Sequence, residues 1–286
     1  MVGKCERHRG GAGSGRHHGG RNAGNHPFVD EGCAEGGGGV HRHVALRRIV
    51  SGMRVEIWSD VICPWCYIGK RRFEQALEGY EHRDGIEIVF RPYQLDPTAP
   101  PGSSTPVREA YAKKFGGFEK ADEIMQHVTR VAADSGLEFH LERAQRANTL
   151  LSHRLLWAAE HEGGETVQVD LKERLLQAYF VDGDNVGDPD TLARIAGEAG
   201  LSPAAIAGVL EGELGLAEVQ ADLEQATDLG ITAVPTFVFE GRWTVPGAQD
   251  ADTFMNVLRR VEQLVAESTD LADESGETCT DDACGT

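Results

Sequence analysis

The sequence lacks long hydrophobic runs, and no stretch of 18 or more apolar residues occurs among its 286 residues. A transmembrane helix needs about 20 predominantly apolar residues, so we expect no membrane-spanning segment and no membrane partner. The N-terminal region also lacks the continuous apolar core of a secretory signal peptide. Together these absences predict a cytoplasmic protein.

Cysteine and positive charge are also scarce. Six cysteines are too few for a disulfide-stapled scaffold of this length, and in reducing surroundings a cysteine pair is more often catalytic or redox-sensing than permanently bridged. The chain has 28 Lys and Arg against 46 Asp and Glu, a formal net charge of −18. An acidic surface repels phosphate backbones, so nucleic acid is not an expected partner.

Residues 1–52 differ in composition from the rest of the chain. They are rich in Gly, His and Arg, carry a net positive charge, and show neither helical nor strand periodicity. We predict a disordered leader. An alternative interpretation is that the native protein begins at Met53, where a clear strand pattern starts.

A pair of cysteines, Cys63 and Cys66, is the most informative feature. The tetrapeptide Cys63-Pro64-Trp65-Cys66 follows an apolar strand-like run and precedes a helix-like one. The first sulfur therefore lies at a helix N-terminus, where free N–H groups and the macrodipole stabilise a thiolate. Pro64 suits the first helical position, and Cys66, one turn later, can close an intramolecular disulfide with Cys63.

The cysteine pair has two other interpretations. Half of a zinc site is one, but zinc prefers four ligands and no second pair at knuckle spacing follows. A structural disulfide is the other, and it fits poorly at the start of a helix in a protein without a signal peptide. Reversible redox chemistry is favoured, with no metal and no cofactor expected.

The order of predicted elements is strand, helix, strand, helical block, hairpin and helix. Strands are expected at 55–58 and 86–90 with a helix at 64–79 between them, which makes a parallel βαβ unit. Strand signals vanish from about 107 to 230 and return at 236–239 and 243–245, on either side of a hairpin turn. A last amphipathic helix is predicted from 250 to 267.

This order, with Cys63-Pro64-Trp65-Cys66 after the first strand and Val234-Pro235-Thr236 opening the third, resembles the DsbA family of the thioredoxin fold. The longer run 59–70 and the segments 230–236 and 245–249 resemble its FrnE-like branch. The resemblance implies an α/β thioredoxin fold (βαβ…ββα) formed by 53–96 and 231–265. It also implies an all-helical insertion, 97–230, between the second and third strands.

The resemblance also implies an activity, thiol–disulfide exchange. Cys63 would attack substrate disulfides and Cys66 would resolve the mixed disulfide, while Pro64 and Trp65 tune the potential. Pro235 matches the family's cis-proline, and with it the backbone of Val234 would bind an extended substrate. Expected partners are proteins or peptides bearing thiols or disulfides, with glutathione as a further candidate.

Three residues, Ile57, Asp60 and His153, either depart from the DsbA-family pattern or have no clear role. The family has an acidic residue six positions before the nucleophile, where this chain has Ile57. Asp60 could cap the helix or, as a like charge, oppose the thiolate, and a structural role is favoured over a catalytic one. His153, on an amphipathic helical stretch, is interpreted as a packing or capping residue.

The C-terminal segment 266–286 is acidic and is predicted to be a disordered tail with a second pair, Cys279 and Cys284. A redox relay with Cys63 and Cys66, a joint zinc site and a tail without function all stay open. The competing functions for the whole chain are a kappa-type glutathione transferase or 2-hydroxychromene-2-carboxylate isomerase-like enzyme, neither of which needs a second thiol, and a redox- or zinc-dependent chaperone. Cys66 favours the oxidoreductase.

Overall fold

A computed structural model of the protein describes residues 52–103 and 105–274, with side chains described to residue 268. All of these residues belong to one compact unit of the chain. The predicted leader, apart from Gly52, and the pair Cys279 and Cys284 lie outside the described residues. Within them, no helix has the length and apolar character needed to cross a membrane.

One mixed sheet has the strand order β2-β1-β3-β4. Its strands are β1 (Met53–Ser59), β2 (Ile86–Pro92), β3 (Thr236–Phe239) and β4 (Trp243–Pro246). β1 pairs with β2 in parallel, whereas β1–β3 and β3–β4 are antiparallel. The predicted βαβ unit and hairpin are therefore confirmed. Both β2 and β4 run one or two residues further than predicted and end in proline, which edge strands tolerate because no neighbour needs the missing N–H.

The helices follow the predicted order, and those between β2 and β3 form the insertion. Their bounds are α1 (Pro64–Glu78), α2 (Val107–Phe115), α3 (Phe118–Asp134), α4 (Leu150–Gln177), α5 (Pro189–Glu198), α6 (Pro203–Leu210), α7 (Leu216–Asp228) and α8 (Ala251–Glu274). Short 3₁₀ and π segments cover Arg83–Gly85 and Ala178–Asp182. The predicted α/β thioredoxin fold with a helical insertion is confirmed.

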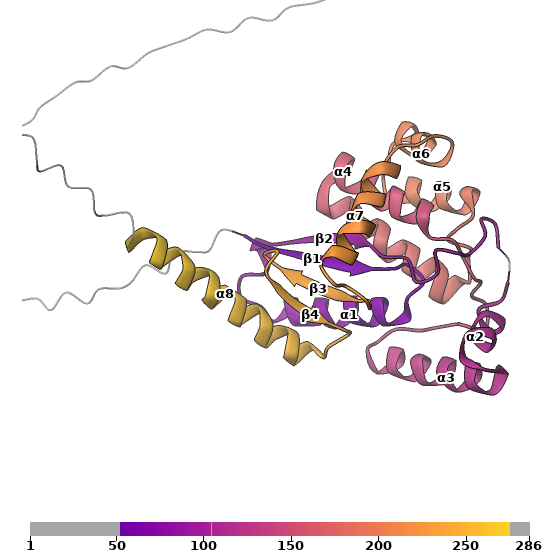
Figure 1. Cartoon of the computed structure of the whole chain (residues 1–286), viewed down its shortest axis with the longest axis horizontal. Helices are drawn as coiled ribbons and strands as arrows, with labels where there is room; N and C mark the ends of the chain where they lie inside the picture. The colour runs from indigo at the N-terminus through magenta and orange to yellow at the C-terminus, as the bar shows by residue number, and fades with distance from the viewer. Residues whose placement is uncertain (1–51, 104, 275–286) are drawn as a thin grey trace, which may run out of the picture. The chain divides into compact units, whose positions relative to one another are not determined.

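The sheet lies between two layers of helices, with α1 and α8 against one face and α4 and α7 on the other side (Figure 1). An apolar core fills the space between the sheet and the α1–α8 layer. Phe73 of α1 lies at its centre, 5.3 Å from the rings of both Phe237 and Phe254. Ile57, at the position where the family has an acid, is buried in this same apolar core.

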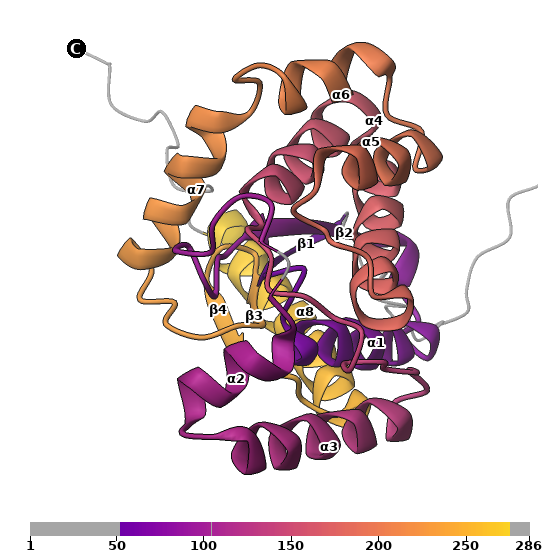
Figure 2. The same cartoon turned by 90° about the vertical axis from the view of Figure 1, so that its right-hand side faces the viewer.

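A second core lies within the insertion and also includes the start of α1. Tyr67 and Ile68 pack there with residues of α3, α4 and α5, so that α1 contributes to both cores. In Figure 2, α1 lies between α3 on one side and α4 and α5 on the other. The insertion is thus built onto the helix that carries the two cysteines.

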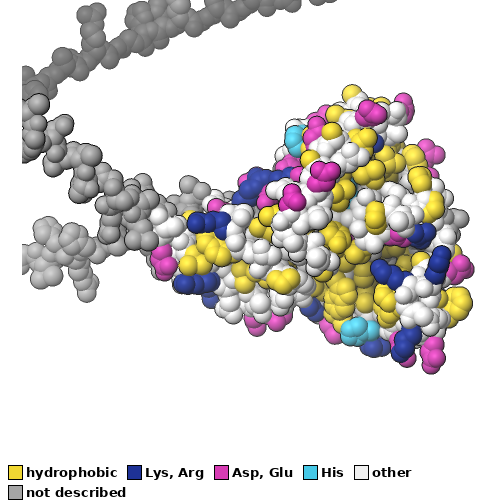
Figure 3. Space-filling model, in the orientation of Figure 1, with side chains coloured by type: hydrophobic (Ala, Val, Ile, Leu, Met, Phe, Trp, Pro, Cys, Tyr) yellow, Lys and Arg dark blue, Asp and Glu magenta, His cyan; other side chains and the backbone are white. Residues whose placement is uncertain are grey.

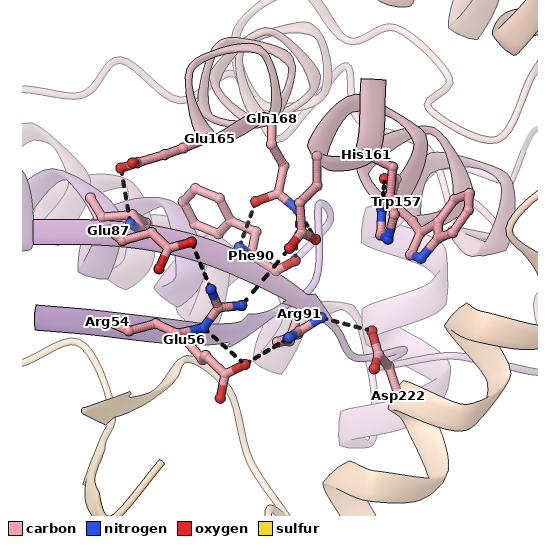
Figure 4. Close-up of polar contacts among 12 residues, drawn as sticks. Arg54, Glu56, Glu87, Phe90, Arg91, Trp157, His161, Glu165, Gln168 and Asp222 are labelled. Carbon is pink, nitrogen blue, oxygen red and sulfur yellow. Dashed lines mark hydrogen bonds and ion pairs between the residues drawn. The ribbon is translucent and has the colours of Figure 1, made fainter. Parts of the chain in front are cut away.

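β2 is an outer strand of the sheet, and side chains of α4 cover its free edge (Figure 4). The Phe90 N–H donates to Gln168 Oε1 at 2.8 Å, and Gln168 Nε2 donates to the Phe90 carbonyl at 3.2 Å. Gln168 Nε2 also reaches the carbonyl of Leu156, across a kink at Gly164 where α4 leaves helical geometry. Glu165 accepts the Ile88 N–H at 2.9 Å. Side chains of α4 thus satisfy backbone groups that an edge strand would otherwise leave unpaired.

The last helix differs from its prediction, because α8 continues to Glu274 instead of ending at Glu267. The first residues of the predicted disordered tail, 266–274, are therefore helical. Acidic composition suggested disorder there, but this stretch also contains Ala, Leu and Glu, which have high helix propensity.

Candidate active site

The Cys63-Pro64-Trp65-Cys66 segment forms the first turn of α1. Cys63 is the N-cap residue with extended backbone angles, and Pro64 occupies the first helical position. The N–H of Cys66 donates to the Cys63 carbonyl at 3.0 Å, which closes the turn and places both sulfurs at the helix start. Both cysteines are buried, and neither is part of a disulfide here.

The loop before β3 faces the first cysteine. The Cys63 thiol donates to the carbonyl oxygen of Val234 at 3.6 Å, and the Val234–Pro235 peptide bond is cis. Gly69, on the next turn of α1, lies against the ring of Pro235, because a Cβ there would sit 3.0 Å from its Cγ. The structure therefore brings together Cys63, Val234 and Pro235, which are far apart in the sequence.

A cleft of about 900 Å³ opens at this place. Cys63, Pro64 and Trp65 line it together with Val234 and residues of α2, whereas Cys66 does not. Hydrophobic side chains gather on the face beside α2 and α3 in Figure 3. The cleft thus gives a ligand access to the first sulfur only.

Tyr111 of α2 lines the cleft, and its phenol stays protonated at neutral pH. Burial, followed by the negative charge of a Cys63 thiolate, raises the pKa of Tyr111 to about 12. A neutral hydroxyl can donate a hydrogen bond but adds no negative charge to the site. The sequence alone does not indicate a role for Tyr111, because an aromatic residue on a short amphipathic helix is ordinarily a packing residue.

Cys66 has a different electrostatic environment. Burial raises the pKa of its thiol well above the ordinary value, and the hydrogen bond with Cys63 and the charge of Cys63 raise it further. The positive charge of Lys172 and the backbone of Asp60 act in the opposite direction. The Cys66 thiol therefore keeps its proton at neutral pH.

Asp60 and His153 are in contact behind the cysteines. The Asp60 carboxylate accepts the Leu95 N–H at 2.8 Å, and its other oxygen lies 3.3 Å from His153 Nε2. The same Nε2 lies 3.1 Å from the Tyr93 carbonyl, so it must be the protonated ring nitrogen that donates to both acceptors. The Asp60 side chain does not cap α1. It instead holds the connection after β2 close to the motif, and His153 lies inside the first turns of α4, whose N-cap residue is Thr149.

Lys172 of α4 is a buried charged residue whose place near the cysteine pair the sequence analysis does not predict. Its side chain is 1 % exposed, and its Nζ has no hydrogen-bond partner among the described residues. The ammonium group lies 5.3 Å from the centre of the Phe90 ring. A signal was present, because Gln168 and Lys172 interrupt the apolar stripe of Leu171, Leu175 and Leu176 at helical spacing.

The other predictions from the sequence concern metal binding and the roles of individual residues around the cysteine pair. Across the described part of the chain, no group of three or more His, Cys, Asp or Glu side chains could hold a metal ion. The roles of Pro64 and Trp65 in tuning the potential, and of Val234 and Pro235 in binding substrate, stay predictions. So does any role of Cys279 and Cys284.

The four-stranded sheet, the helical insertion and the paired thiols at the start of α1 define a thioredoxin-fold protein of the DsbA type. Residues 54–259 match the family model of the DSBA-like thioredoxin domain. The match covers well over half of the chain, and the chain belongs to this family.

Individual proteins are similar over most of this region. An uncharacterized protein, YwbO, from Bacillus subtilis (strain 168) is 28% identical over 205 residues, which is 71% of this chain and 94% of that protein. A probable DsbA oxidoreductase from Streptomyces coelicolor has 34% identity and a TM-score of 0.68, covering 82% of this chain and 94% of its own. The cytosolic disulfide reductase DsbM from Pseudomonas aeruginosa with GSH shares the fold at 18% identity and a TM-score of 0.53, covering 73% and 99% of the two chains.

Proposed function

We propose that this DsbA-like oxidoreductase exchanges disulfides with protein or peptide substrates through Cys63 and Cys66, and that it is a cytoplasmic member of the FrnE-like branch. One observation carries the proposal: of the two free thiols at the start of α1, only Cys63 lines the cleft, and Val234 lines it beside Cys63. This arrangement separates an attacking sulfur from a resolving one.

In the proposed reaction, the Cys63 thiolate attacks one sulfur of a substrate disulfide and forms a mixed disulfide. The other substrate sulfur leaves as a thiolate. Cys66 then loses its proton and attacks Cys63, which forms the Cys63–Cys66 disulfide and releases the second substrate thiolate. The reverse sequence oxidises a substrate dithiol and returns both cysteines to the reduced state.

The cleft supports an extended substrate as the partner. The Val234 carbonyl accepts a hydrogen bond from the Cys63 thiol. A backbone N–H of a bound substrate chain could donate to the same carbonyl in place of the thiol. Glutathione is proposed as a small-thiol partner, and a structure of the similar reductase from Pseudomonas aeruginosa with GSH supports testing it first. A transferase or isomerase would not need the buried thiol of Cys66, which favours disulfide exchange.

The test is a redox titration of the purified protein in glutathione buffers, followed by alkylation and peptide mass spectrometry. We expect Cys63 and Cys66 to interconvert as a pair. Cys63→Ser should abolish exchange, and Cys66→Ser should accumulate glutathione on Cys63. The double variant Cys279→Ser/Cys284→Ser is the control for the other pair and should retain exchange between Cys63 and Cys66.

The proposal would be overturned if Cys63 and Cys66 stayed reduced in every glutathione buffer. Alkylation of both thiols after denaturation would show that they had stayed reduced. Full exchange activity in Cys63→Ser would also overturn the proposal. In either case a transferase, an isomerase or a binding function would account better for the cleft.

A further inference from the structure

The buried lysine behind the cysteine pair has no part in the reaction as written above. Burying an ammonium group without a partner is expensive, so buried lysines are usually paired or lose their charge. Lys70 of α1 shows the ordinary solution: it is also buried, but its ammonium is paired with Glu74 and Glu173. Lys172 has no comparable pairing among the described residues.

Contacts of its neighbours fix the position of Lys172. One turn earlier, Gln168 is bonded to the edge of β2 through both backbone groups of Phe90. The next residue, Glu173, accepts the Tyr67 hydroxyl at 2.7 Å, and Tyr67 directly follows Cys66. Lys172 is thus held between the sheet and the turn of α1 that carries Cys66.

The groups whose charges act on Lys172 are Cys66 and Cys63, Asp60 and Lys70. Asp60 is already engaged by the Leu95 N–H and by His153. Lys70 repels Lys172 and is held by its own carboxylates. Among the groups that act on it, the two thiols are therefore those whose protonation changes during disulfide exchange.

We propose that Lys172 controls the protonation of Cys66, by accepting its proton when Cys66 attacks the mixed disulfide and returning one when Cys66 leaves. The inference rests on the proposed function, because it concerns the second step of that reaction. As Cys66 Sγ loses its proton, Lys172 Nζ gains one, and the sulfur electron pair forms the bond to Cys63. The Cys63–substrate bond breaks, and the substrate sulfur leaves with its electron pair.

The protonation equilibria of the two groups fit this exchange. Burial lowers the pKa of Lys172 to about 8, so a fraction of the amine is neutral near pH 7 and can accept a proton. The charge and hydrogen bond of Cys63 that raise the Cys66 pKa disappear once Cys63 is in a mixed disulfide. The positive charge formed on Lys172 then stabilises the Cys66 thiolate until it attacks.

The first test measures the Cys66 pKa directly, without any substrate. In a Cys63→Ser background, ultraviolet absorbance reports the Cys66 thiolate, and the matching Cys63→Ser/Cys66→Ser protein subtracts the other thiols. Adding Lys172→Met should raise the Cys66 pKa by about 1 to 2 units, the usual effect of losing a nearby opposite charge. Adding Lys70→Met, the matched buried lysine, should leave it unchanged.

The second test follows resolution of the glutathione mixed disulfide in the full chain by rapid acid quench across pH. Lys172→Met should slow this step about 3- to 10-fold near pH 7, since a lower thiolate fraction is partly offset by higher nucleophilicity. Lys172→Arg keeps the charge but cannot give up its proton. It should therefore lose the dependence on a group titrating near pH 8, whereas Lys70→Met should keep it.

The outcomes separate this inference from the proposed function. If the wild-type protein exchanges disulfides and Lys172→Met matches it in both the Cys66 pKa and the resolution rate, the role of Lys172 is refuted. A pH profile of Lys172→Arg identical to the wild type would also refute proton exchange. If the wild type exchanges no disulfides, the proposed function fails, and the titration still shows whether Lys172 controls Cys66.

Discussion

Replacing Lys172 by methionine should make the protein more stable, although the residue serves the reaction. Lysine has a pKa of about 10.4 in an unfolded chain, and burial lowers the pKa of Lys172 to about 8 in the folded protein. Each pKa unit corresponds to about 1.4 kcal/mol. The charged lysine therefore lowers the free energy of unfolding by about 3 kcal/mol at pH 7, and methionine removes this cost at similar volume.

The gain in stability expected for Lys172→Met should depend on pH. Between about pH 8 and pH 10.4 the unfolded state binds more protons than the folded state, so the free energy of unfolding of the wild type rises with pH in this window. The cost of the charged lysine is full below about pH 8 and absent above the unfolded pKa. The stability advantage of Lys172→Met should therefore shrink as the pH rises from 7 to 10.

Urea unfolding of the wild type and Lys172→Met at pH 7, 8.5 and 10 measures both effects. Lys70→Met is the matched control: it removes a buried lysine that is ion-paired, so it should be destabilising at every pH. The reasoning fails if Lys172→Met is less stable than the wild type at pH 7, or if the difference between the two does not change with pH. Equal denaturant slopes would show that both proteins unfold to similar states.

Two further substitutions test the contacts that position the site. Gln168→Leu leaves both backbone groups of Phe90 without a partner. Urea unfolding should therefore show a free energy of unfolding lower by about 2 to 5 kcal/mol. A loss below about 1 kcal/mol would contradict the assignment of these two hydrogen bonds. Gly69→Ala places a Cβ 3.0 Å from Pro235 Cγ and 3.4 Å from Ala248, so it should cost about 1 to 3 kcal/mol and slow alkylation or exchange at Cys63. Unchanged stability and rate in Gly69→Ala would mean that the Pro235 loop moves aside freely.

Much of the fold was predictable from local patterns. The strand before Cys63, the βαβ unit and the hairpin after Pro235 each have a clear periodicity and punctuation, and the structure confirms their order. The strand ends moved by one or two residues, because pairing continues wherever a neighbouring strand is present. The end of α8 was predicted too early, since composition alone weighed the acidic charge more heavily than helix propensity.

The residues of α4 that lie behind the cysteine pair could not be predicted in the same way. Lys172 and Gln168 interrupt an apolar stripe, which indicates burial but not the groups that they face. Phe90, which is bonded to Gln168, and Cys66, whose charge acts on Lys172, lie on elements that come together only through the packing of α4 against β2 and α1. Periodicity gives the inward face of a helix, whereas the identity of its neighbour depends on the tertiary arrangement.

The position of the insertion within the chain has a consequence for synthesis. Cys63 and Val234, which meet in the cleft, are separated by 171 positions in the sequence. At typical elongation rates of about 5 to 20 residues per second, roughly 10 to 35 s pass between their appearance. During that interval the nascent chain carries Cys63 and Cys66 without the loop that faces Cys63. The two cysteines of the motif are thus synthesised well before the cleft in which Cys63 is proposed to react is complete.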